Sequence, residues 1–146
     1  MSKKVKPILP MVGSYEGDEM YVYASYDRSD GDLVANILAV AKKNGARISF
    51  DPKRMAGAIS MVAFLSHSAK HSRLVWEDLE IAKSLYMDVT CFYLDDFYLG
   101  KEEERRLGFR FIHLEDVSIL QYGSILESHF PQDVYPGPPK KVNTGN

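Results

Sequence analysis

Two periods of apolar residues alternate along the middle of the chain. Runs of β-branched and aromatic residues are followed by stretches in which apolar residues recur every three or four positions, a spacing that places them on one side of a helix. The runs predict strands over residues 20–26, 47–50, 61–65, 89–94 and 109–114. The spaced stretches predict helices over 30–44, 72–87 and 117–128, with shorter helical segments over 52–58 and 101–107.

Strands that alternate with helices predict an α/β domain with a mainly parallel sheet and helices on both of its faces, because right-handed crossovers pack each helix against the sheet. This domain is predicted to span residues 20–130. Residues 1–19 carry prolines and glycines but few periodic apolar positions, which indicates an extended arm. Residues 131–146 are rich in proline and end in polar residues, which predicts a disordered tail.

The composition narrows the class of protein. With 146 residues, 45% of them hydrophobic, the chain is long enough to bury a core as one domain. A net charge of -2 argues against a nucleic-acid partner, and no apolar stretch has the length of a membrane span. We therefore expect a soluble cytoplasmic protein without membrane contact. Cys91 is the one cysteine, so no internal disulfide can form, and its apolar neighbours predict a buried side chain.

Candidate binding residues lie in the loops that follow strands, since ligands of parallel sheets bind beyond the carboxyl ends of the strands. One such loop brings Ser25, Tyr26 and Arg28 next to the start of a predicted helix, where the helix dipole favours a phosphate. The alternative interpretation is that Ser29 and Asp30 only cap this helix. The residues alone leave both interpretations open.

No metal site is predicted. His67 and His71 lack a third zinc ligand nearby. Asp95 and Asp96 follow a strand as magnesium ligands would, but a receiver domain needs a further acid pair after the first strand and a lysine after the last. The chain also lacks the glycine-rich phosphate-binding motifs and the GxSxG motif of hydrolases.

Several short motifs in a fixed order resemble those of a known family. They are Tyr23-Ala24-Ser25-Tyr26 with Asp27 and Asp30, Gly45, Phe50-Asp51, Phe64-Leu65-Ser66, Ser72, the run Asp78 to Ala82, and Leu94-Asp95-Asp96. By their order and spacing the chain resembles a bacterial TIR (Toll/interleukin receptor) domain over residues 20–96, and less closely as far as residue 130.

The resemblance implies a flavodoxin-like three-layer sandwich with strand order 2-1-3-4-5, and self-association or contact with another TIR domain. For many members it also implies cleavage of the nicotinamide–ribose bond of NAD, which would be a substrate and not a tightly bound cofactor. The catalytic glutamate of those members matches Asp78, or Glu80 in a shifted alignment. Ser25, Tyr26, Arg28 and Ser66 would then line the nucleotide pocket.

Two departures from the family pattern favour one function over two others. Asp78 is one methylene shorter than glutamate, and only fourteen residues lie between Asp51 and Ser66, which shortens the loop after the second strand. We therefore expect a TIR-like association domain with weak or lost catalysis. The alternatives are an active NAD glycohydrolase or cyclase of a bacterial defence or toxin system, and an unrelated flavodoxin-like nucleotide-binding module. Asp78 is expected on the open rim, outside the core, so that its replacement by alanine leaves the fold intact.

Overall fold

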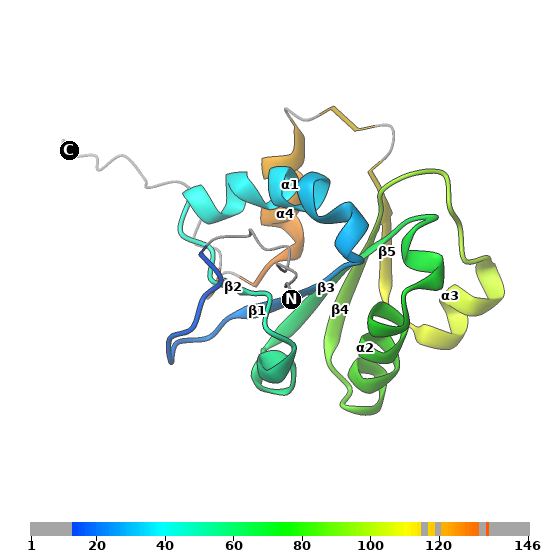
Figure 1. The fold of residues 1–146 in the computed structure, drawn as a ribbon, viewed down its shortest axis with the longest axis horizontal. Coiled ribbons are helices and arrows are strands. Elements are labelled where there is room, and N and C mark those ends of the chain that lie inside the picture. Colours follow the sequence, from blue (N-terminus) through cyan, green and yellow to red (C-terminus); the bar gives the residue numbers. More distant parts are fainter. Residues whose placement is uncertain (1–12, 115–116, 119–120, 132–133, 135–146) are drawn as a thin grey trace, which may run out of the picture.

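Five parallel strands form one sheet in the computed structural model, which describes residues 13–114, 117–118, 121–131 and 134. The strands are β1 (Val22–Ser25), β2 (Ile48–Ser49), β3 (Ser60–Leu65), β4 (Asp88–Tyr93) and β5 (Arg110–His113). Their order is β2-β1-β3-β4-β5, and every neighbouring pair is parallel (Figure 1). The predicted fold class, a flavodoxin-like α/β sandwich, and its strand order are confirmed.

Helices cover both faces of this sheet (Figure 1). The α-helices are α1 (Gly31–Lys43), α2 (Arg73–Ser84), α3 (Lys101–Leu107) and α4 (Tyr122–His129), and none of the described helices is long and apolar enough to cross a membrane. Helices α1 and α4 pack together on one face, whereas α2 lies on the other. Three short 3-10 helices, η1 (Arg28–Asp30), η2 (Pro52–Gly57) and η3 (Ala69–His71), follow β1, β2 and β3. They gather the polar loops at the carboxyl edge of the sheet.

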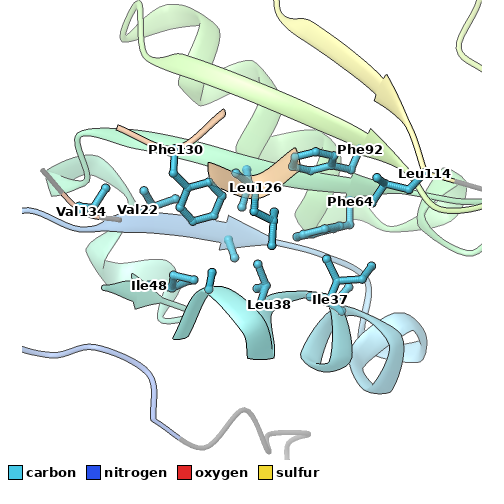
Figure 2. Close-up of a cluster of buried hydrophobic side chains, with 14 residues drawn as sticks. Val22, Ile37, Leu38, Ile48, Phe64, Phe92, Leu114, Leu126, Phe130 and Val134 are labelled. Carbon is cyan, nitrogen blue, oxygen red and sulfur yellow. The ribbon is translucent and has the colours of Figure 1, made fainter. Parts of the chain in front are cut away.

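The central strands are buried on both faces, so successive side chains enter two different cores. On β3, Val62 and Phe64 join the core under α1 and α4, where Phe64 stacks on Phe92 with ring centroids 5.6 Å apart (Figure 2). Met61 and Leu65 join the core under α2 instead. Burial on both sides is the reason why β3 reads as an unbroken apolar run in the sequence.

Most elements begin or end a residue or more away from the bounds that the sequence predicts, and the clearest cases are β2, α2 and α4. β2 has two residues where four were expected. Helix α2 ends at Ser84 and not at residue 87, because Tyr86 adopts a left-handed backbone with a φ of 57°, which an α-helix does not tolerate. Helix α4 begins at Tyr122 rather than at 117, while residues 119–120 lie outside the described part of the chain.

Both ends of the described chain pack near β2. In the predicted arm, the backbone N–H of Tyr15 donates to the carbonyl of Ile48 at 2.8 Å. In the predicted tail, Val134 is fully buried in the core, and its carbonyl accepts from the N–H of Arg47 at 3.1 Å. The folded part therefore includes residues from both predicted extensions, whereas residues 1–12, 132–133 and 135–146 lie outside the described residues.

Candidate functional site

The carboxylate of Asp78 lies against the end of β1. Its Oδ2 atom accepts a hydrogen bond from the Ser25 hydroxyl at 2.7 Å and another from the Tyr23 hydroxyl at 2.9 Å. All three residues are buried, and Asp78 keeps only 4% of its surface exposed. Asp78 and Ser25, which the sequence assigned to one site, are therefore in direct contact. Their polar atoms are hydrogen-bonded to each other rather than directed at a ligand.

The two-residue period of a strand and the 3.6-residue period of a helix bring these groups together. Tyr23 and Ser25 are two positions apart on a strand, so both side chains point from the same face of the sheet toward α2. Helix α2 begins after Ser72, whose hydroxyl accepts from the N–H of Val75 at 3.4 Å. From that start the helical repeat turns Asp78 inward together with the apolar residues of the buried side, Val75, Leu79 and Ala82.

The electrostatics of this buried cluster favour neutral groups. Burial raises the pKa of Asp78, although the hydrogen bonds from Ser25 and Tyr23 act in the opposite direction. Burial, together with the neighbouring Asp78 charge, raises the pKa of Tyr23, so its phenol stays protonated and acts as a donor. The expectation that Asp78 lies on the open rim and outside the core is wrong, because two buried polar groups of β1 require an acceptor there.

Ser66 belongs to a second, separate cluster. Its hydroxyl donates to Oδ2 of Asp30 at 2.6 Å and accepts from the N–H of Ala69 at 2.9 Å. Asp30 precedes α1 without a side-chain capping bond, whereas Asp27 caps η1 by accepting from the N–H of Ser29 at 3.0 Å. Burial raises the pKa of Asp30, and the nearby acids Asp27 and Asp95 add to this effect. The negative charge of these acids at the start of α1 disfavours the binding of a phosphate, which the sequence left open as one interpretation of this loop.

The remaining predicted site residues lie in different surroundings. Tyr26 is half-buried and meets Phe50 edge to face, with ring centroids 6.2 Å apart. Arg28 is exposed in η1. Glu80 joins α2 to α3 through an ion pair with Arg106 at 2.6 Å. Glu80 also lines a groove along the outer side of α2, which contains none of the other predicted site residues.

One group of potential metal ligands was not foreseen. The ligand atoms of His67, Asp95 and Asp96 lie within 4.8 Å of one another, at the carboxyl ends of β3 and β4. His67 Nε2 and Asp96 Oδ1 are 2.6 Å apart, and Asp95 accepts from the backbone N–H groups of His67 at 3.2 Å and Phe97 at 3.0 Å. Each side chain already has a hydrogen-bond partner, so the cluster is able to hold a divalent cation but does not require one. Sequence spacing missed the cluster because His67 is almost thirty positions away from the adjacent Asp95 and Asp96.

No family model matches the chain, and neither a curated protein nor a solved structure matches it. Functional argument therefore starts from the clusters described above. Tyr23 is the member of the Asp78 cluster that sequence reasoning left out of the site, and its position two residues before Ser25 was the signal that could have found it.

Replacing Asp78 by alanine is expected to destabilise the protein by about 1–3 kcal/mol, because the buried hydroxyls of Tyr23 and Ser25 lose their acceptor. The matched control is Glu77→Ala. Glu77 is the neighbouring acid, and it makes only an exposed ion pair with Arg73, so its removal is expected to cost less than about 0.5 kcal/mol. Urea unfolding of the three proteins measures both effects, and equal losses in the two variants would contradict the buried role of Asp78.

The raised pKa of Asp78 also sets a pH dependence. The folded protein holds the proton of this carboxyl more readily than the unfolded chain, whose carboxyl has the ordinary value of 3.8. The stability that the protonated Asp78 carboxyl contributes is therefore lost as the pH rises from 3.8 through the pKa of the folded state. Asp78→Asn does not titrate, so the stability of this variant relative to the parent is expected to improve over that window. Unfolding of both proteins from about pH 4 to about pH 8 tests this; the opposite trend would show that the hydrogen bonds outweigh the burial.

Proposed function

We propose that this chain is a TIR-like association module in which NAD-cleaving chemistry is weak or absent. The observation that carries the proposal is the state of the Asp78 carboxylate, which is 4% exposed and bound by two hydroxyls. A carboxylate that holds ribose hydroxyls and stabilises a developing positive charge must touch its substrate. Asp78 would have to break both hydrogen bonds and leave the core before it could do so. The cytoplasmic location expected from the sequence belongs to the same proposal, whereas the bacterial defence or toxin setting belongs to the alternative of an active NAD glycohydrolase.

Two features near the carboxyl edge of the sheet support weak catalysis. The segment after β2 is reduced to the two turns of η2, and Arg54 binds that segment to residues of the amino-terminal arm. The start of α1 carries Asp27 and Asp30, whose charge disfavours the pyrophosphate of a dinucleotide. Both features make this edge a poor binding site for NAD.

An exposed flank of α2 supports association. Leu74, Ile81 and Leu85 follow one another at spacings of seven and four residues, which places them in one stripe along the helix. Their exposed fractions are 43%, 45% and 48%. A row of half-exposed large apolar side chains beside the groove at Trp76 is a surface that gains free energy when another protein covers it.

An active NAD glycohydrolase is the second candidate. It is favoured by the 2.7 Å contact between Asp78 and Ser25, since both groups were assigned to the nucleotide site from the sequence. An unrelated flavodoxin-like binding module gains no support, because a different strand order would have favoured it and the order is β2-β1-β3-β4-β5.

Purified protein at high concentration is expected to release no nicotinamide from NAD above the background, because Asp78 is inaccessible. Chromatography of the products measures this. The control is Asp78→Asn, which keeps the shape of the side chain but not its charge. Nicotinamide release by the parent protein that disappears in Asp78→Asn would overturn the proposal and establish the enzyme.

Ile81→Asp is expected to weaken self-association at least tenfold, because it places a charge in the apolar stripe of α2. The matched control is Leu33→Asp on α1, where the side chain is exposed to a similar extent, 41%, and lies away from that stripe. Sedimentation equilibrium gives the dissociation constant of each protein. Loss of association in both variants, or in neither, would contradict the assignment of the α2 surface.

A further inference from the structure

A segment of the arm, which we name the strap (residues 13–19), is held by one arginine of η2. Arg54 donates from Nη1 to the carbonyl of Tyr15 at 2.9 Å and from Nη2 to the carbonyl of Gly17 at 2.6 Å. The same guanidinium lies over the Tyr21 ring, 4.3 Å from its centroid, and 5.8 Å from that of Tyr15. Hydrogen bonds and ring contacts thus fix the strap at a single side chain.

The strap also pairs with the edge of the sheet. β2 is an edge strand, and the N–H of Tyr15 donates to the carbonyl of its Ile48 at 2.8 Å. The Ser14 hydroxyl accepts from the N–H of Phe50 at 2.9 Å just beyond the strand. The strap thus covers part of an open sheet edge through one backbone hydrogen bond and one side-chain contact, and sheet edges recognise peptides through contacts of these kinds.

The strap is shaped for this site. A Cβ atom on Gly17 would collide with the Tyr15 hydroxyl, so residue 17 has no room for a side chain while Tyr15 is in place. The Tyr15 hydroxyl in turn accepts from the N–H of Glu19 at 2.9 Å. A bend over residues 17–19 then leads to β1. The bend is the link through which the strap reaches its own domain.

We infer that the site around Arg54 also accepts the strap of a second copy of this chain, so that two copies associate by exchanging straps. The inference rests on the proposed self-association and adds a second contact between the copies to that of the α2 stripe. The site already holds residues of this sequence, and a second copy presents the same carbonyls, the same tyrosine and the same N–H group. Only the end of the bend at residues 17–19, beyond the Gly17 carbonyl that Arg54 holds, has to open, which is the ordinary route to a domain-swapped dimer.

Exchange conserves the contacts of the strap. Each copy gives up one strap and receives another, so the contacts with Arg54, Tyr21 and Ile48 are all regained. Exchange is opposed by the proximity of each strap to the site on its own chain, where its effective concentration is about a millimolar. Exchange therefore responds to local concentration, as expected of a module that functions by assembling.

Complementation between two defective variants tests the exchange. Arg54→Ala has a normal strap but no arginine to hold it. Tyr15→Pro keeps Arg54 but loses the N–H donor, the ring and the hydroxyl of the strap. In an equal mixture, the strap of the first variant fits the site of the second. Native mass spectrometry with one variant labelled with nitrogen-15 counts the heterodimers and homodimers.

Heterodimers are expected in excess over their statistical share, by at least about threefold in their ratio to homodimers. Lys53→Ala replaces Arg54→Ala in the matched control. It removes the adjacent positive charge but retains the strap and its site, so it is expected to give a smaller excess. Thermal unfolding checks that each variant folds, and Tyr15→Ala replaces Tyr15→Pro if the proline variant does not.

The outcomes separate this inference from the proposed function. Dimers of the parent protein together with a statistical mixture of variants would overturn the exchange and leave association standing. A monomeric parent protein with abundant heterodimers would support the exchange site but overturn association as the function of the native chain. Monomers throughout would overturn both.

Discussion

Burial of β1 on both of its faces is the constraint on which the rest of the structure depends. The strand lies between β2 and β3 in the sheet, with Val22 and Ala24 in the core under α1. On its other face, Tyr23 and Ser25 carry hydroxyls into the core under α2. Buried hydroxyls need partners, and Asp78 supplies one acceptor oxygen for both. The position of α2 over the sheet is thereby tied to a polar contact as well as to apolar packing.

This contact also decides what the carboxylate is able to do. A helix acid whose carboxylate lies beside the carboxyl end of a parallel strand is well placed for chemistry, because ligands of such sheets bind there. An acid that is closed in by a tyrosine and a serine serves the fold instead. This geometry is the ground for the proposal that catalysis is weak, since one carboxylate cannot both fill the core and hold a substrate.

The proposal of association is drawn from two exposed parts of the molecule. The stripe of Leu74, Ile81 and Leu85 runs along one flank of α2 and is apolar and half-exposed. The edge of β2 is covered by a short segment whose contacts centre on Arg54. These two surfaces lie on different elements. Contact with the α2 stripe would be stabilised by burial of apolar area, whereas the strap is held by a backbone hydrogen bond and by charge-assisted hydrogen bonds from Arg54.

The sequence by itself determined the fold class and the burial of Cys91, because both follow from the local pattern of apolar residues. The strand order followed from the family resemblance and not from that pattern. The sequence did not predict the ends of α2 and β2. The left-handed backbone of Tyr86 and the hydrogen bond between Tyr15 and Ile48 leave no trace in the period of apolar residues. Only the tertiary structure decided the environment of Asp78, the meeting of His67 with Asp95 and Asp96, and the capture of the strap by Arg54. The reason is physical: each depends on contacts between residues that are distant in the sequence, and spacing along the chain records which face a residue occupies but not which partner it finds there.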